Sequence, residues 1–163
     1  MPQPKPLPPV ELLREYFNYN PLTGEVRNKV RRANSLAGAL AGNKRKDGYI
    51  LITLNYARYL AHRIAWKMQT GQEPPIHLDH KDRDTSNNVF DNLRVSDPWS
   101  NQGNRKPGRG KCLPGTKRNG KNRWAATCVE GHIGQFDTEK EAHQAYVQWH
   151  LQKYGEFSIY AEP

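Results

Sequence analysis

The chain has 163 residues, and its 25 Lys and Arg against 16 Asp and Glu give a formal net charge of +9. The mean hydropathy is −0.94, and no stretch approaches the roughly 20 consecutive apolar residues that span a bilayer, so an integral membrane protein is excluded. The two cysteines form no C-x-x-C pair, which excludes a disulfide framework and a zinc ribbon and favours a reducing, cytoplasmic setting. The N-terminus is rich in Pro and lacks the apolar core of a secretory signal. The basic excess favours an acidic partner, most simply nucleic acid.

Positive charge is concentrated in residues 27–46 and 106–123, each with seven basic residues and no acidic one. The second stretch begins with many Gly and Pro residues, which is typical of an extended linker. We therefore predict a disordered Pro-rich segment over residues 1–9, a first domain over 10–105, a basic linker over 106–114 and a second domain over 115–163.

The first domain alternates short helices and strands. Apolar spacing predicts helices over residues 10–17 and 60–68, the second ended by Gly71 and two prolines. Strands are predicted over 25–30, 49–54, 76–79 and 93–95, and the last two flank a polar loop. Asp97 followed by Pro98 predicts a helix start, with the helix running to about residue 105.

The second domain has two clear strands followed by one helix. The strands are predicted over residues 123–129 and 132–136. Thr138 and Glu141 have the spacing of a capping box, and the helix continues to Tyr154 before Gly155. This order predicts a sheet packed on one helix, and the whole chain is assigned to the α+β class.

The polar loop carries the chemistry, because it opens with Asp79 and His80 and continues with several carboxamides. Phosphodiester hydrolysis needs a base near neutral pKa, which His supplies, and a hard cation held by Asp or Asn oxygens. Neighbours on a regular strand point to opposite faces, so Asp79 and His80 share one site only if the strand ends or distorts there. Asp and Asn clusters also occur in ordinary solvated loops, and Asp84 to Asn87 is typical of a turn.

Residues 60–105 resemble the HNH endonucleases of phages and mobile elements. The resemblance is carried by Ala61-His62-Arg63-Ile64-Ala65-Trp66, Asp79-His80-Lys81-Asp82, Asn87-Asn88-Val89-Phe90-Asp91-Asn92-Leu93-Arg94 and Ser100-Asn101-Gln102. It implies a ββα-metal fold in which two short strands and a helix hold one divalent ion. By this resemblance His80 is the general base, Asn92 holds His80 or its loop, and Asp79 and Asn101 are metal ligands. An all-oxygen shell favours Mg²⁺ or Mn²⁺.

Residues 115–158 resemble the APETALA-type, or ethylene-response-factor, DNA-binding domains. The most specific part is Gly134-Gln135-Phe136-Asp137-Thr138-Glu139-Lys140-Glu141-Ala142, followed by Ala145-Tyr146. The resemblance implies a small three-stranded sheet that enters the DNA major groove and a helix that backs it. Lys117, Arg118, Arg123 and Trp124 fall at matching DNA-contact places, and Trp124 is equally explained as a core aromatic. Val129 and His132 depart from the pattern, so we expect fewer or different base contacts.

These features together predict a metal-dependent DNA endonuclease of the homing or phage HNH type, directed to its site by the C-terminal domain. The alternative is a non-catalytic, sequence-specific DNA-binding protein with a decayed nuclease fold, and nothing in the sequence selects RNA. The expected partner is double-stranded DNA, and neither a membrane nor a nucleotide cofactor is expected. We expect a monomer or weak dimer in the cytoplasm, which is the host cell's cytoplasm if a phage encodes the protein.

Overall fold

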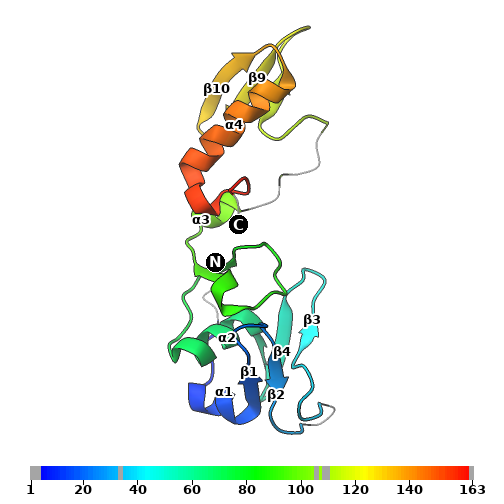
Figure 1. The fold of residues 1–163 in the computed structure, drawn as a ribbon, viewed down its shortest axis with the longest axis vertical. Coiled ribbons are helices and arrows are strands. Elements are labelled where there is room, and N and C mark those ends of the chain that lie inside the picture. Colours follow the sequence, from blue (N-terminus) through cyan, green and yellow to red (C-terminus); the bar gives the residue numbers. More distant parts are fainter. Residues whose placement is uncertain (1–4, 33–34, 105–106, 108–110, 162–163) are drawn as a thin grey trace. The chain divides into compact units, whose positions relative to one another are not determined.

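The computed structural model describes residues 5–32, 35–104, 107 and 111–161, and the side chain of Asn101 lies outside this part. The chain divides into two compact units, Met1–Ser96 and Asp97–Pro163. Each unit has its own sheets and helices, which mixes α and β structure as expected (Figure 1).

The first unit is built from small antiparallel sheets and two helices. Its elements are α1 (Val10–Tyr16), β1 (Phe17–Tyr19), β2 (Val26–Asn28), β3 (Asn43–Lys44), β4 (Ile50–Leu54), β5 (Ala57–Leu60), α2 (Ala61–Thr70), β6 (Leu78–His80), a 3₁₀ turn η1 (Phe90–Asn92) and β7 (Leu93–Val95). Strands β1 and β2 pair, β3, β4 and β5 form one sheet in that order, and β6 pairs with β7. The predicted helices and strands are therefore confirmed, whereas β1, β3 and β5 were not predicted, because strands of two to four residues carry too little alternation to recognise.

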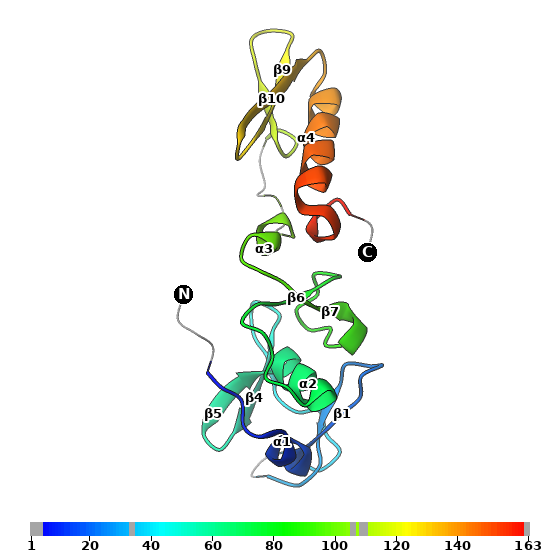
Figure 2. The same ribbon diagram turned by 90° about the vertical axis from the view of Figure 1, so that its left-hand side faces the viewer.

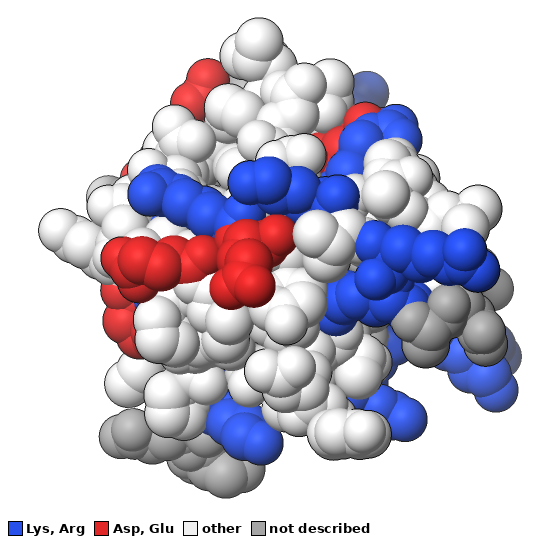
Figure 3. Space-filling model, turned by 90° about the horizontal axis from the view of Figure 1, so that it is seen from below, with Lys and Arg blue, Asp and Glu red and all other residues white. Residues whose placement is uncertain are grey.

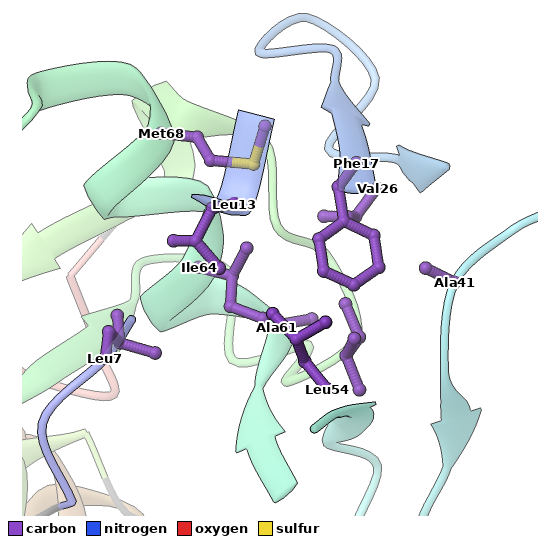
Figure 4. Packing of buried hydrophobic residues seen from close by; sticks show 10 residues of the cluster. Leu7, Leu13, Phe17, Val26, Ala41, Leu54, Ala61, Ile64 and Met68 are labelled. Carbon is purple, nitrogen blue, oxygen red and sulfur yellow. The ribbon is translucent and has the colours of Figure 1, made fainter. Parts of the chain in front are cut away.

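The main core of this unit lies between α1, α2 and the strands (Figure 4). Leu13 from α1, Phe17 from β1 and Ile64 from α2 are fully buried there. Helix α2 buries its apolar face in this core and ends at Gly71, whose φ of +74° lies in the left-handed region that glycine adopts without strain. This packing holds α2 as a fixed platform for the residues that follow it.

The described part of the N-terminal segment packs against the first unit. Leu7 is buried, its backbone N–H donates to Glu73 Oε1 at 2.9 Å, and its carbonyl accepts from Lys67 Nζ at 3.2 Å. Residues 5–9 therefore differ from the predicted disorder, because one apolar side chain and both backbone groups find partners. Residues 1–4 lie outside the described part.

The β6–β7 hairpin is anchored on α2 by an apolar cluster and by hydrogen bonds to the segment that precedes β6. Ala65, Leu78 and Leu93 form a second, smaller buried cluster. The buried Arg63 donates from Nη1 to the carbonyl of Pro75 at 2.8 Å and from Nη2 to that of Pro74 at 3.2 Å. These bonds hold the segment that leads into β6, so α2 sets the position of the hairpin.

The second unit is a three-stranded sheet with one long helix along it (Figure 2). Its elements are α3 (Ser100–Gly103), β8 (Thr116–Arg118), β9 (Trp124–Cys128), β10 (Gly131–Phe136), α4 (Glu139–Tyr154) and a 3₁₀ turn η2 (Gly155–Phe157). The predicted capping box is present, since Thr138 Oγ1 accepts from the Glu141 N–H and Glu141 Oε2 accepts from the Thr138 N–H. None of the helices in the described ranges is long and apolar enough to cross a bilayer.

Helix α3 belongs to the second unit, so the division comes earlier than the predicted linker. The Ile159 N–H donates to the Gly103 carbonyl at 2.7 Å. A Cβ on Gly103 would lie 2.5 Å from Cγ of Tyr154, so this glycine lets the end of α4 pack directly on α3. The helix has four residues, shorter than predicted, and much of the predicted linker lies outside the described residues.

Candidate active site

His80 is the last residue of β6 and lies almost fully inside the first unit, with 2% of its surface exposed. Its Nε2 lies 3.4 Å from Oδ1 of Asn88. Its ring meets that of His62 edge to face, at 5.2 Å between centroids, and that of Tyr49 at 6.0 Å. The imidazole is therefore held by residues from α2, from the position just before β4 and from the 81–92 loop.

Burial lowers the pKa of His80, because the charged imidazolium loses hydration there. The hydrogen bond with Asn88 and the negative charge of Asp79 oppose this shift but are smaller. Burial, followed by the neighbouring His80 and Arg63, lowers the pKa of His62 to about 3. Both imidazoles are thus neutral near pH 7, the state in which a histidine can accept a proton.

Asp79 lies on the other face of the strand from His80, as pleating requires. Its Oδ2 accepts two hydrogen bonds from the cross-strand partner Arg94, from Nε at 3.1 Å and from Nη2 at 3.0 Å. Both side chains are largely buried, at 15% and 11% exposed. Strand β6 ends at His80, which still pairs in register with Leu93, so the strand end does not bring the Asp79 and His80 side chains onto one face.

Asn92 braces the loop that follows His80. Its Oδ1 accepts from the Asp82 N–H at 3.0 Å, and its Nδ2 donates to Asp82 Oδ1 and to the Asn87 carbonyl, each at 2.9 Å. The Lys81 N–H also donates to the Asn92 carbonyl at 2.9 Å. Asn92 therefore closes the two ends of the loop on each other.

The carboxylates inside this loop serve as turn acceptors. Asp82 Oδ1 accepts from the Asp84 N–H at 2.9 Å, and Asp84 Oδ1 accepts from both the N–H and the Oγ of Ser86. Asp82 Oδ2 accepts from Asn87 Nδ2 at 2.6 Å. The turn predicted at Asp84 is confirmed, and the loop is held by short local bonds of this kind.

The two residues predicted as ligands of a divalent ion are Asp79 in the first unit and Asn101 in the second unit. Asp79 offers carboxylate oxygens, which suit a hard cation. Asn101 lies in α3, but its side chain lies outside the described part of the chain. Among the described residues, no group of three or more His, Cys, Asp or Glu side chains could hold a metal. Asp79 belongs to the first unit and Asn101 to the second, so a metal shell made of both residues stays an expectation from the HNH resemblance.

Sequence reasoning missed three contacts of His80, namely Asn88, His62 and Tyr49. Asn88 and His62 stand in the quoted motifs, but no role there linked them to His80, and Tyr49 stands outside the motifs. Each of the three is a polar or aromatic residue that packs beside the buried His80. Such a residue cannot be distinguished from ordinary core packing by the sequence pattern alone.

The four predicted DNA-contact residues divide between the two faces of the C-terminal sheet. Helix α4 covers the face that bears Thr116 and Ala126, since Thr116 Oγ1 donates to Glu139 Oε1 at 3.3 Å and Ala126 is fully buried. Arg118 and Trp124 are register partners two residues away from Thr116 and Ala126, so pleating puts them on this same face. Lys117 and Arg123 alternate with them and lie on the open face, where both are exposed.

Residues 59–102 match the model of an HNH endonuclease family. The match begins in β5, spans α2 and the β6–β7 hairpin with its loop, and ends in α3. Neither a curated protein nor a solved structure matches the chain. The matched family supports a nuclease, and nucleases of this family generally depend on a divalent metal.

Proposed function

We propose that the chain is a metal-dependent DNA endonuclease of the HNH type that hydrolyses phosphodiester bonds. One observation carries the proposal: within the span that matches the HNH family, a neutral, buried His80 ends a strand directly after Asp79. Anchored on α2 and braced by Asn92, this strand end is a rigid support of the kind a catalytic base needs.

In the proposed reaction His80 accepts a proton from the attacking water. The water oxygen forms a bond to phosphorus, and the bond from phosphorus to the leaving deoxyribose oxygen breaks. Asn92 keeps the loop closed while Arg94 holds the Asp79 carboxylate on the neighbouring strand. In this proposal the β6–β7 hairpin positions the reacting groups, and the His80 imidazole transfers the proton.

Asp79 and Asn101 are the proposed ligands of one divalent ion, Mg²⁺ or Mn²⁺. When bound, such an ion supplies positive charge that offsets the charge developing on the phosphate and the leaving oxygen. Both residues offer oxygen donors, which distinguishes these two ions from Zn²⁺ with its preference for nitrogen and sulfur.

The second unit is proposed to select the site on double-stranded DNA, as in a homing or phage enzyme. Lys117 and Arg123 lie exposed on the open face of its sheet, and we assign DNA contacts first to these two. Arg118 is also exposed and is proposed as a further DNA contact, whereas Trp124 is half-buried and is proposed to support the sheet. In the view from below, Lys and Arg side chains form several separate groups beside a central acidic group, and smaller acidic areas lie toward the edges (Figure 3).

The test is cleavage of supercoiled plasmid that carries candidate target DNA, with Mg²⁺, with Mn²⁺ or with EDTA. We expect nicked or linear product with either ion and none with EDTA. Binding to the same DNA without cleavage under any ion would instead support the alternative, a non-catalytic DNA-binding protein with a decayed nuclease fold. Cleavage of RNA alone would contradict the proposed substrate.

A further inference from the structure

Asn88 is the most constrained polar residue beside His80. It is 2% exposed, and its backbone carbonyl accepts from the Tyr19 hydroxyl at 2.8 Å. The turn before β2 packs on the same backbone, because a Cβ on Gly24 would lie 2.6 Å from the carbonyl carbon of Asn88. These backbone contacts alone fix the position of Asn88.

The side-chain amide of Asn88 has a defined orientation. Its Nδ2 donates to the Ser86 carbonyl at 3.2 Å, so the nitrogen end of the amide is directed into the loop. The oxygen end therefore faces His80, 3.4 Å from Nε2. A flipped amide would place its oxygen against the Ser86 carbonyl oxygen, which is repulsive, so the loop sets the orientation of the amide.

An amide oxygen carries no proton and can only accept a hydrogen bond. The partner nitrogen of a neutral imidazole must then be the one that carries the proton, and the other nitrogen becomes the basic one. The ring also has little freedom to turn, because His62 meets it edge to face at 84° and Tyr49 at 61°.

We infer that Asn88 is a positioning residue that holds His80 in the tautomer with its proton on Nε2, which makes Nδ1 the basic nitrogen. The catalytic meaning of this assignment rests on the proposed nuclease function, but the tautomer itself does not. Asn92, by contrast, holds the loop through Asp82 and Asn87.

The tautomer is measured directly by long-range ¹H–¹⁵N correlation spectra of the full chain labelled with [¹⁵N]histidine, at a pH where His80 is neutral. The His80 signals are identified by their loss in His80→Gln. We expect the pattern of a protonated Nε2 and an unprotonated Nδ1 in the parent protein. A protonated Nδ1, or a rapid average of the two forms, in the parent overturns the inference without any variant being needed.

Three variants test the role of Asn88. Asn88→Leu keeps the volume but removes the acceptor, and we expect its His80 to show a mixture of tautomers. Asn88→Asp keeps an acceptor and should keep the Nε2–H form. Asn87→Ala disturbs the same loop without a contact to His80, and we expect the parent pattern there. An unchanged pattern in folded Asn88→Leu overturns the role of Asn88.

Cleavage kinetics then connect the tautomer to the proposed reaction. We expect Asn88→Leu to lower kcat at least roughly tenfold with KM little changed, as part of the 10²–10⁴-fold that a general base contributes. Asn88→Asp should recover most of this loss. If the parent cuts no DNA, the nuclease proposal fails while the spectra still decide the tautomer. If the parent cuts DNA and Asn88→Leu cuts equally well, only the positioning role fails.

Discussion

At the scale of single residues, His80 is the side chain on which the proposed chemistry depends. We predict that His80→Ala loses cleavage by roughly 10²–10⁴-fold, because no proton acceptor remains for the attacking water. DNA binding should survive, since His80 is buried away from the exposed basic side chains. Plasmid cleavage and a gel-shift assay measure the two quantities separately. The matched control is His77→Ala on the segment before β6, and activity within tenfold of the parent in His80→Ala would remove His80 as the base.

The proposed metal shell gives a second prediction at this scale. Asn101→Ala removes one oxygen ligand, so we expect the Mg²⁺ concentration for half-maximal rate to rise, or activity to disappear. The measurement is initial cleavage rate against Mg²⁺ concentration, with Asn104→Ala as the neighbouring control. An unchanged titration in Asn101→Ala together with a raised one in Asn104→Ala would transfer the ligand role to Asn104.

His62 links the stability of the first unit to pH. Its pKa is lowered to about 3 in the folded protein, chiefly by burial, while the unfolded chain titrates near 6.5. Between these values only the unfolded chain binds the proton, so the stability from a neutral His62 is complete above about pH 6.5 and is lost as the pH falls toward 3. The slope is at most about 1.4 kcal/mol per pH unit for one proton.

Denaturant unfolding of the parent and of His62→Phe across this pH range checks the prediction. The pKa values of His80 and His150 are also lowered by burial, so part of the slope should remain in both proteins. The difference between the two curves belongs to His62, and a difference that does not change with pH would contradict its depressed pKa.

The sequence identified the residues of the site better than their partners. Asp79 and His80 stand side by side in a recognisable string, and the pleat rule correctly separated their side chains. The contact between His80 and Asn88 depends on how the 81–92 loop folds back, and the contact with His62 depends on where α2 packs. Such contacts join elements that no local pattern connects, so they become visible only in three dimensions.

At the scale of elements, the β6–β7 hairpin is held by a cross-strand ion pair in addition to its backbone bonds. Asp79 and Arg94 are mostly buried, so removing Arg94 leaves a carboxylate with poor hydration. We predict that Arg94→Met lowers the free energy of unfolding by about 3–5 kcal/mol, as expected for a broken buried pair. Urea unfolding of Arg94→Met, Asp79→Asn and the double variant measures the coupling. A cost below about 1 kcal/mol would be that of an exposed pair and would contradict this role.

Element prediction from the sequence succeeded where end signals were strong. Helix α4 begins at its capping box and ends at Gly155, both of which are legible as residue types at fixed spacing. Helix α3 is shorter than predicted and β8 was not predicted from its residues, because each is held by tertiary partners. For β8 these partners are the ladder to β9 and the bond from Thr116 to Glu139.

At the scale of the whole molecule, the place where the chain divides changes which fragments should be stable. Residues 97–163 include α3, whose Gly103 packs on Tyr154 and accepts from Ile159. We predict that a fragment of residues 97–163 unfolds at a higher temperature than one of residues 115–163, because the shorter fragment uncovers the end of α4. Thermal unfolding followed by circular dichroism compares the two fragments. Equal unfolding midpoints would indicate that the boundary between the two units lies in the basic linker, as the sequence predicted.

The same fragments test the proposed division of labour on DNA. Residues 97–163 should keep site preference in a footprinting assay, and residues 1–96 should bind weakly with little preference. Each lost phosphate contact lowers the slope of log K against log salt by about one. Lys117→Ala and Arg123→Ala should each reduce this slope in the full chain, with Lys153→Ala at the helix end as the control. Full site selectivity in residues 1–96 would contradict the reading role of the second unit.

The turn at Gly24 bears on whether the site could be moved to another protein. A Cβ there would lie 2.4 Å from the backbone nitrogen of Val89, so this early turn and the late loop are built as one piece. Tyr19 and Tyr49, which contact Asn88 and His80, also precede residue 59, where the family match begins. A protein engineer who grafted only residues 59–102 onto a new scaffold would leave this support behind. The transferable unit of the site is therefore the longer block that starts with the first strand.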